Sequence, residues 1–397
     1  MNLIVQKYGG SSLENGIKME AVAKKILSKT QEGYKVIVVV SAMGKTTQNL
    51  LDLTRSIVEK PSPRELDMLL TTGEQISASL LAMVISEKGI TCRALNAFQL
   101  GIKTDHTHTE ARIQSIDSQA LLSWFEEYEV LVITGFQGVT EEGDLTTLGR
   151  GGSDTTAVAL AAVLQAPCEI YSDVSGIYTI DPKVYPNAKK LLKIRYDEML
   201  EMARHGSKVL HDRSVEIAQR FQIPIYCASS FSDEPGSLVV EETNQEDAPV
   251  VTGLSILNHQ VLITAEMNRD ESLLFSLTDH LKENKLNIDM IAWIRNVDKT
   301  FLSLSVWEKP GLPIRKELDQ IADHYADNHL QWHNDYTKIT LVGAKMRNTT
   351  GVAASIFQVI PVQDIHMVTT SEISVSLLTP TYASLKMIQK VAGEFSL

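Results

Sequence analysis

The fold of this chain is decided by a glycine-rich stretch that opens an apolar run, Leu148-Gly149-Arg150-Gly151-Gly152-Ser153-Asp154-Thr155-Thr156. Residues 157–164 are all alanine, valine or leucine, so the pattern predicts a tight turn followed by a buried helix. The first turn of a helix has backbone N–H groups without intrahelical partners, and these groups can bind an anion. Arg150 adds a planar fork for a carboxylate or phosphate, whereas Asp154 alone could simply cap the helix. The stretch indicates either an anion site or an ordinary strand-to-helix turn.

A second glycine turn lies near the N-terminus. Residues 1–6 are typical of a short buried strand and residues 15–28 of a helix, and the connection between them contains Lys7-Tyr8-Gly9-Gly10-Ser11-Ser12. Adjacent glycines let a ligand approach the backbone, and a lysine supplies a point charge to it. A third element of this kind contains Gly44-Lys45-Thr46. A P-loop would need glycine five positions before Gly44, where Val39 stands, so that motif is excluded.

Six blocks of the sequence resemble, in chain order, the signatures of the aspartate kinases. They are Lys7-Tyr8-Gly9-Gly10-Ser11-Ser12, Val40-Ser41-Ala42-Met43-Gly44, Thr71-Thr72-Gly73-Glu74, Gly149-Arg150-Gly151-Gly152-Ser153-Asp154, Ser172-Asp173-Val174-Ser175-Gly176-Ile177-Tyr178-Thr179-Ile180-Asp181-Pro182 and Gly206-Ser207-Lys208-Val209-Leu210-His211. The resemblance covers the whole chain. It implies ATP-dependent phosphorylation of the aspartate side-chain carboxylate, with Mg²⁺ carried by the nucleotide. It also implies an α/β amino-acid kinase fold, a mostly parallel sheet covered by helices, followed by two ferredoxin-like ACT domains.

The residue pattern divides near position 245. Before it, apolar strands alternate with helical stretches, which is typical of a parallel sheet covered on both faces. After it, a strand–helix–strand–strand pattern occurs twice, and the two copies resemble tandem ACT domains. We therefore expect a catalytic domain at 1–245, a first ACT domain at 259–336 and a second at 337–397. The family resemblance adds a strand at 250–258 to the second ACT domain.

Composition limits the class of protein. Asp and Glu outnumber Lys and Arg by 49 to 37, and the net charge of −12 argues against binding to nucleic acid or an anionic membrane. The three cysteines lie far apart, as expected for reduced thiols rather than for disulfides or a metal site. We find no signal-peptide pattern and no long apolar span, so we expect a cytoplasmic protein.

The resemblance implies which residues bind ATP and which act in catalysis. Lys7 would contact the transferred phosphoryl group, Asp154 would orient the lysines, and Lys208 would reach the ATP phosphates; these three form the predicted catalytic set. The other predicted ATP-binding residues are Gly9 and Gly10 as backbone donors, then Ser172, Asp173, Tyr178 and Lys183. From the residues alone, Asp173 could instead form a turn and Tyr178 could pack in a core.

The predicted substrate pocket pairs opposite charges. By resemblance, Arg150 and Ser153 bind the α-carboxylate of aspartate, Glu74 binds its α-ammonium, and the pocket is completed by Ser41, Thr47 and Phe136. Glu74 could also be an ordinary carboxylate in the first turn of a helix. No side chains are assigned to a metal: Asp105-His106-Thr107-His108 is similar to a metal pair but lacks further ligands in a clear frame.

The ACT region suggests an effector site and self-association. The resemblance implies a homo-oligomer formed through ACT domains and an amino-acid effector such as lysine, threonine or methionine. The candidate effector residues are Asn287, Asp289, Asn348, Thr350, Gly351 and Val352. Asp289 would accept the ammonium and the Gly351 and Val352 N–H groups would bind the carboxylate, although Asp289 could instead cap a turn. The segment Arg269-Asp270-Glu271-Ser272 lacks the proline–glycine turn usual in the first ACT loop.

Two other functions stay open at this point. One is another kinase on the same fold, which the pairing of Glu74 with Arg150 disfavours because it matches the two charges of an amino acid. The other is a catalytically inactive ACT sensor, which the presence of Lys7, Asp154 and Lys208 disfavours. Fold alone does not separate these possibilities.

Overall fold

The computed structural model describes residues 1–243, 249–267, 272–283, 286–296, 299–308, 315–324 and 330–397. The chain forms two compact units. The first contains Met1–Ile177, Lys190–Arg204 and Lys208–Glu246, and the second contains Tyr178–Lys189, His205–Ser207 and Asp247–Leu397. The loop positions Arg269, Asp270 and Glu271 lie outside the described residues, so the expectation about the first ACT loop stays a prediction.

The first unit is built on an eight-stranded sheet with the order β12-β14-β13-β9-β1-β2-β6-β3. The pairs from β13 to β3 are all parallel, so the predicted mostly parallel sheet is confirmed. The strands are β1 (Leu3–Tyr8), β2 (Lys35–Val40), β3 (Cys92–Leu95), β6 (Val130–Thr134), β9 (Cys168–Ser172), β12 (Lys193–Arg195), β13 (Ile225–Ser229) and β14 (Ser237–Val240).

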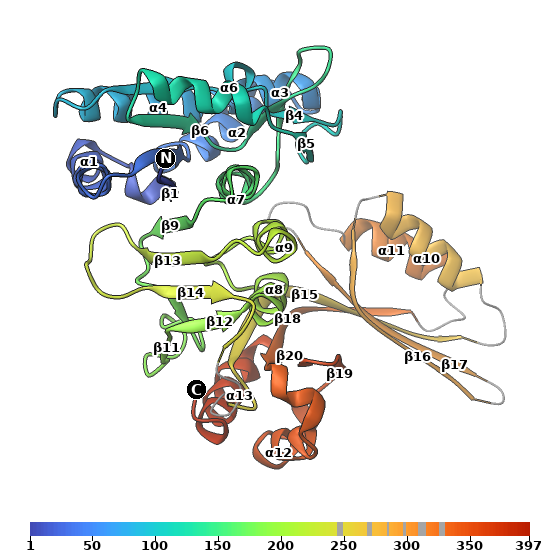
Figure 1. Cartoon of the computed structure of the whole chain (residues 1–397). Helices are drawn as coiled ribbons and strands as arrows, with labels where there is room; N and C mark the ends of the chain where they lie inside the picture. The colour runs from blue at the N-terminus through green and yellow to red at the C-terminus, as the bar shows by residue number, and fades with distance from the viewer. Residues whose placement is uncertain (244–248, 268–271, 284–285, 297–298, 309–314, 325–329) are drawn as a thin grey trace. The chain divides into compact units, whose positions relative to one another are not determined.

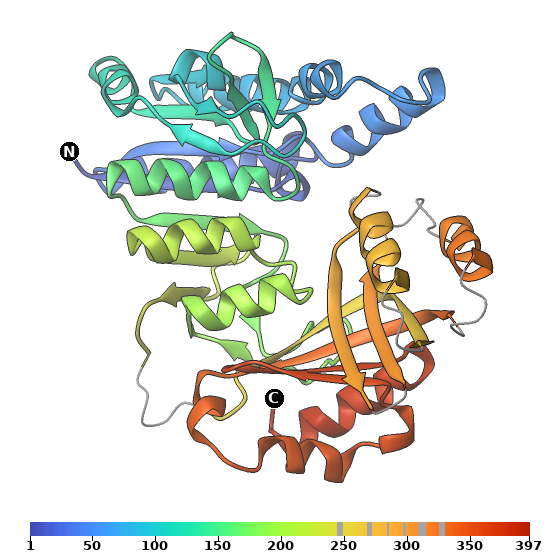
Figure 2. The ribbon, with the colours of Figure 1, turned by 90° about the vertical axis from the view of Figure 1, so that its right-hand side faces the viewer.

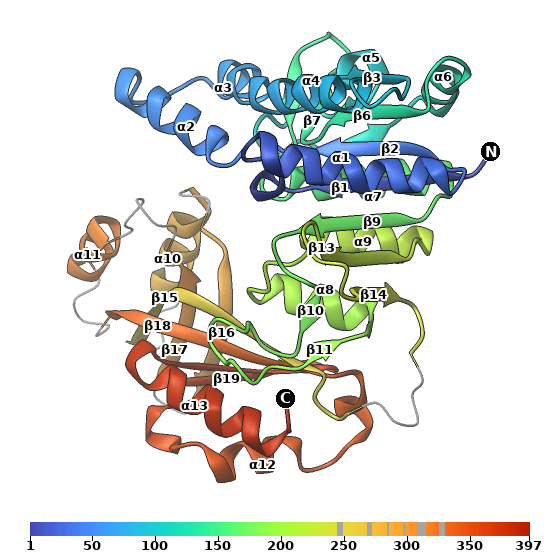
Figure 3. The same ribbon diagram turned by 90° about the vertical axis from the view of Figure 1, so that its left-hand side faces the viewer.

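Helices cover both faces of this sheet, which is why the central strands are apolar along their whole length. Figure 1 shows α1 (Gly16–Gln31) on one side of β1 and α7 (Gly152–Leu164) on the other. Helix α1 runs along β1 and β2 (Figure 3) and shares one hydrophobic cluster with α4 (Thr72–Ser86). On the opposite face α7 packs beside α9 (Asp212–Phe221), as Figure 2 shows.

Smaller elements complete the first unit. A four-stranded sheet has the order β5-β4-β7-β8, and its strands are β4 (Lys103–Thr104), β5 (Ile113–Ser115), β7 (Gln137–Val139) and β8 (Leu145–Thr147). The remaining elements are α2 (Thr46–Ile57), α3 (Pro63–Leu70), α5 (Ala97–Leu100), α6 (Ser118–Ser123), α8 (Tyr196–Arg204), the short 3₁₀ helices η1 (Gly10–Ser12) and η2 (Trp124–Glu126), and the strands β10 (Ile177–Tyr178) and β11 (Lys190–Leu191). The three cysteines are free thiols, as expected.

One expectation about apolar segments was wrong. The stretch formed by α3 and α4, Pro63–Ser86, is long and apolar enough to cross a membrane by length and composition alone, with a mean hydropathy of 1.4 over its most apolar window. Half of that window is buried within the protein. Ala78, Leu81 and Ile85 of α4 pack against the sheet, and a buried core helix passes the same test as a membrane span.

The second unit contains a six-stranded antiparallel sheet with the order β16-β17-β15-β18-β20-β19. Its strands are β15 (Gly253–Met267), β16 (Ile288–Arg295), β17 (Thr300–Trp307), β18 (Gln331–Val342), β19 (Met367–Thr370) and β20 (Ser374–Pro380). Its helices are α10 (Ser272–Glu283), α11 (Arg315–His324), α12 (Val352–Val359) and α13 (Thr381–Glu394), with 3₁₀ turns η4 (Ala344–Asn348) and η5 (Val362–Asp364).

The long strand β15 joins two segments that the sequence pattern separates. The strand predicted at 250–258 continues without a break into the first predicted ACT domain, because β15 runs from Gly253 to Met267, with an irregularity between Leu257 and Gln260 where His259 has φ +63°. On either side of this irregularity the buried residues pack into different clusters. Val261 and Ile263 pack with α10, whereas Leu254 packs with α12 and α13. One strand therefore serves both helix layers of the second unit.

Residues 178–189 fold with the second unit although they precede the predicted boundary at 245. Ile180 is 1% exposed and packs in the same cluster as Leu341 and Leu377. The Leu254 N–H donates to the Thr179 carbonyl at 2.7 Å. Part of the predicted nucleotide segment is thus held by the sheet of the second unit.

Candidate active site

A pocket of about 530 Å³ lies in the first unit, at the carboxyl ends of parallel strands β1, β2 and β6. Ligands of open α/β sheets bind at this edge. All six predicted substrate residues line the pocket, together with Lys7, Gly10 and Asp154 from the predicted catalytic and ATP sets. Its other lining residues are Ala42, Gly44, Leu51, Leu66, Leu70, Thr109, Thr147, Gly149, Gly151 and Gly152, which the sequence analysis did not assign to the substrate.

Lys7 and Asp154, which both line this pocket, form an ion pair. Lys7 lies in β1 and Asp154 in the first turn of α7, and Lys7 Nζ is 2.6 Å from Asp154 Oδ1. Both side chains are only 12% exposed. A buried ion pair of this kind fixes the position of the ammonium, because moving either charge leaves the other unpaired in a medium of low dielectric constant. Lys7 therefore presents its charge in a defined direction.

The backbone around the pocket requires glycine at specific positions. A Cβ on Gly10 would lie 2.5 Å from the Ala42 carbonyl oxygen, so the first glycine turn packs directly against the segment after β2. Gly151 has φ +68° and precedes α7, and a Cβ there would meet the His211 side chain at 2.3 Å. The sequence analysis missed Gly135, where a Cβ would lie 2.7 Å from Ser153. Its position directly after the apolar strand 130–134 could have indicated a glycine turn next to the site.

Glu74 is the most perturbed carboxylate of the pocket. It lies in the first turn of α4 and is 3% exposed. Its Oε1 accepts the Ala42 N–H at 3.0 Å, while its buried Oε2 has no hydrogen-bond partner among the residues that the structure describes. Burial raises the pKa of Glu74 to about 7, against the lowering effect of the Ala42 N–H. A buried acceptor without a donor is costly unless a ligand supplies one.

The other predicted substrate residues line the same pocket as this carboxylate. Ser153 is buried in the first turn of α7, and Arg150 is exposed in the turn before it. Phe136 has φ +95°, a strained backbone for a bulky residue, and its N–H donates to Thr156 Oγ1 at 3.2 Å. The pocket thus combines an arginine, a carboxylate and small polar groups.

The remaining predicted ATP residues lie outside this lining. The Gly9 N–H donates to the Tyr171 carbonyl, Ser172 Oγ accepts the Val174 N–H, and Asp173 and Lys208 are exposed. Tyr178 and Lys183 belong to the second unit, where the Lys183 N–H donates to Asp181 Oδ1 at 2.9 Å. The structure therefore groups the substrate residues more closely than the nucleotide residues.

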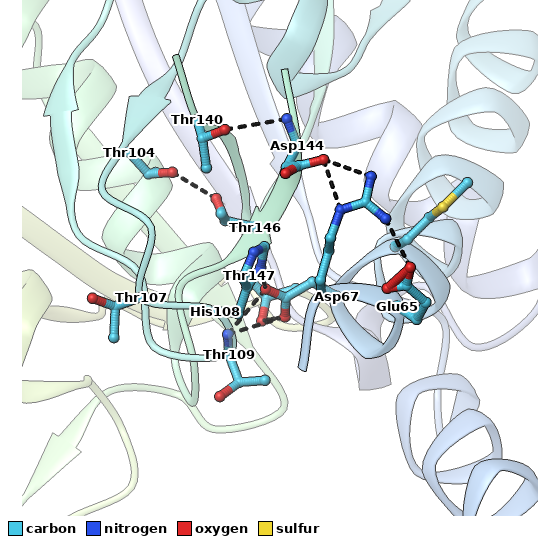
Figure 4. Close-up of polar contacts among 12 residues, drawn as sticks. Glu65, Asp67, Thr104, Thr107, His108, Thr109, Thr140, Asp144, Thr146 and Thr147 are labelled. Carbon is cyan, nitrogen blue, oxygen red and sulfur yellow. Dashed lines mark hydrogen bonds and ion pairs between the residues drawn. The ribbon is translucent and has the colours of Figure 1, made fainter. Parts of the chain in front are cut away.

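The histidine pair at 106 and 108 has other partners. His108 Nδ1 lies 2.8 Å from Asp67 Oδ2 (Figure 4), and His106 Nδ1 lies 3.3 Å from Glu142. Across the described ranges, no group of three or more His, Cys, Asp or Glu side chains could hold a metal ion.

The candidate effector residues lie in the second unit. Asp289 forms an ion pair with Lys338, whose side chain is only 1% exposed. The other carboxylate oxygen of Asp289 is buried and has no hydrogen-bond partner within the described residues. Gly351, with φ +89°, precedes α12, and Val352 is its first residue. Asn287, Asn348 and Thr350 are exposed.

Comparisons with known proteins decide the family. Residues 2–229 match the model of the amino acid kinase family, and residues 339–395 match an ACT domain. The chain is 39% identical over 401 residues to aspartokinase 2 of Bacillus subtilis, a match that covers 100% of this chain and 98% of the relative. The chain belongs to the aspartokinase family. The family, the fold class and the kinase activity predicted from the sequence are thereby confirmed.

Solved aspartokinase structures share the fold. Aspartokinase III of E. coli in complex with aspartate and ADP matches with a TM-score of 0.81 at 24% identity, covering all of both chains. The same enzyme in complex with lysine and aspartate matches with a TM-score of 0.78 at 25% identity, covering 99% of each chain.

Proposed function

We propose that this aspartokinase binds L-aspartate in the pocket of its first unit and transfers the γ-phosphoryl group of ATP to the β-carboxylate, giving 4-phospho-L-aspartate. The observation that carries this assignment is the buried Oε2 of Glu74, which has no partner in the described part of the chain and lies in a pocket that also contains Arg150. An α-amino acid carries an ammonium for the first group and a carboxylate for the second. Ser153 would assist Arg150, and Ser41, Thr47 and Phe136 would enclose the side chain.

The chemistry needs charge compensation rather than a base. The β-carboxylate has an ordinary pKa near 4, so at neutral pH it is already an ionised nucleophile. The barrier arises from repulsion between this anion and the triphosphate, and from charge on the phosphoryl group during transfer. Lys7, fixed by Asp154, would stabilise that charge, and the positive end of the α7 dipole would add to the effect.

The nucleotide roles follow the family pattern. Gly9, Gly10 and Lys208 would contact the phosphates, and Ser172, Asp173, Tyr178 and Lys183 would contact the nucleoside. Mg²⁺ bound to the phosphates would neutralise part of their charge.

The second unit would carry regulation. We propose two ACT domains at 259–336 and 337–397, the latter with strand 250–258, and a catalytic domain at 1–245. An amino-acid effector, such as lysine, threonine or methionine, would bind through Asn287, Asp289 and the loop of Asn348, Thr350, Gly351 and Val352. The protein would be a cytoplasmic homo-oligomer that contributes to amino-acid biosynthesis.

Trapping with hydroxylamine tests the reaction, since an acyl phosphate gives a hydroxamate and a phosphate ester does not. Purified protein, ATP, Mg²⁺ and L-aspartate should give aspartyl hydroxamate, and the Lys7→Ala variant should give almost none. L-glutamate, acetate and carbamate serve as alternative acceptors. Hydroxamate formation from one of these in preference to aspartate would contradict the assignment.

A further inference from the structure

Asp67 is a completely buried carboxylate of α3 that the proposed reaction does not use. Figure 4 shows three neighbours converging on it. The Thr147 hydroxyl donates to Oδ1 at 2.6 Å, His108 Nδ1 lies 2.8 Å from Oδ2, and the Thr109 N–H lies 3.2 Å from Oδ1 and 3.0 Å from Oδ2. A carboxylate buried this deeply is retained only where its surroundings supply such donors.

These donors come from two separate segments of the chain. His108 and Thr109 lie in the loop between β4 and β5, and Thr147 is the last residue of β8. The two segments also contact each other directly, because the Ala111 N–H donates to the Thr147 carbonyl at 2.9 Å. Thr109 has φ +70°, so the loop holds a backbone conformation that it would leave without its partners. Asp67 thus joins α3, the loop and the strand end.

Both segments flank the turn that carries Arg150. Thr147 lies three residues before Arg150 in the sequence. A Cβ on Gly149, which has φ +77°, would lie 3.2 Å from the Thr109 carbonyl oxygen, so the loop packs directly against the turn. Thr109 and Thr147 line the pocket together with Arg150, whereas Asp67 and His108 are not part of its lining. A change at Asp67 therefore reaches the pocket only through these neighbours.

We propose that Asp67 is a positioning residue that sets the Arg150 turn, and with it the affinity for the substrate α-carboxylate. The inference rests on the proposed role of Arg150. The Asp67 carboxylate fixes the Thr109 loop and the end of β8. These two segments in turn fix the backbone position of Arg150, from which its guanidinium extends. Small displacements of a positioning group lower binding and rate steeply.

Steady-state kinetics of Asp67→Asn test this inference, because asparagine keeps the shape and removes the charge. We expect the aspartate KM to rise at least roughly tenfold, with kcat at saturating aspartate and the ATP KM nearly unchanged. Thr146→Val is the matched control. Thr146 directly precedes Thr147 and is also buried. Its hydroxyl lies 2.6 Å from the Thr104 hydroxyl and does not contact Asp67 (Figure 4). It should lower the melting temperature and leave the aspartate KM unchanged.

A double-mutant cycle with Arg150→Lys separates this inference from the function on which it rests. If Asp67 acts through Arg150, Asp67→Asn should add little to the aspartate KM of Arg150→Lys. Full additivity, or an unchanged KM in Asp67→Asn alone, overturns the inference. An unchanged aspartate KM in Arg150→Lys overturns the role of Arg150 itself. Should Asp67→Asn not fold, His108→Gln removes one donor from a more exposed position, and an unchanged aspartate KM in that variant also overturns the inference.

Discussion

Lys7 Nζ lies 2.6 Å from Asp154 Oδ1, so the ammonium of β1 is held by a carboxylate in the first turn of α7. The pair joins the two glycine turns, and its two residues are 147 positions apart in the sequence (154 − 7). Both side chains are largely buried, and both line the pocket. In the proposed reaction Asp154 holds the lysine that meets the transferred phosphoryl group.

Replacement of either partner should therefore lower the rate more than the stability. We expect Lys7→Ala and Asp154→Ala each to lower kcat by at least ~100-fold, as for the loss of a preorganised charge-stabilising group. Steady-state kinetics with a coupled ADP assay measure this effect, and circular dichroism checks the fold. Lys35→Ala, a half-buried lysine at the start of β2 that lies outside the pocket lining, is a control that should keep kcat. A near-normal kcat in Lys7→Ala or Asp154→Ala would remove that residue from the mechanism.

Glu74 should make aspartate binding depend on pH. Its pKa is about 7 in the free protein, and only the ionised form can hold the substrate ammonium. As pH falls below about 7 the carboxylate takes up a proton, so the aspartate KM should rise, approaching a tenfold rise per pH unit. The ATP KM should not follow this dependence. Initial rates between pH 6 and pH 8.5 measure both constants, and an aspartate KM that is flat over this range would contradict the role of Glu74.

The same residue should reduce stability in the absence of substrate. Because burial raises the pKa of Glu74 from 4.5 to about 7, the folded protein binds this proton more tightly than the unfolded chain. The stability of the ligand-free protein therefore falls as pH rises through this range, by at most about 3 kcal/mol from this group. Glu74→Gln removes the buried charge and should melt at a higher temperature than the parent at pH 8. Thermal melts at pH 5 and pH 8 should show this gain at pH 8 only. A Glu74→Gln protein less stable than the parent at pH 8 would show that the carboxylate is not under strain.

The sequence predicted the two glycine turns and the parallel sheet, because each depends on a short pattern next to an apolar strand. The family resemblance supplied six substrate residues that line one pocket in the structure, and their roles stay a prediction. It did not predict that 178–189 fold with the second unit, since nothing in Tyr178 or Ile180 specifies a partner strand more than 70 residues away. The ion pair between Asp289 and Lys338 was missed for the same reason. Asp67 was missed because a lone aspartate in an amphipathic helix looks like a solvent-facing residue until its three neighbours are placed around it.

Asp289 should matter for inhibition by an amino acid. We expect millimolar lysine to inhibit the kinase and Asp289→Asn to weaken that inhibition without lowering kcat, because Asp289 Oδ2 is a buried acceptor without a partner among the described residues. Asparagine is preferable to alanine, since Lys338 is buried and alanine would leave its ammonium without the side-chain oxygen of residue 289. Inhibition curves for lysine, threonine and methionine, singly and combined, measure the effect. An enzyme indifferent to all of them would leave the ACT region without a regulatory role.

The most direct test of the account is the discrimination between L-aspartate and succinate, which is aspartate without its ammonium. The parent enzyme should favour aspartate by roughly 100-fold in kcat/KM, measured as hydroxamate formation, because succinate leaves the buried Glu74 oxygen unpaired. In Glu74→Gln this preference should largely disappear, because kcat/KM falls with aspartate, and not only because it rises with succinate. A preference that is the same in the parent and in Glu74→Gln would contradict the central claim that this carboxylate selects the amino acid.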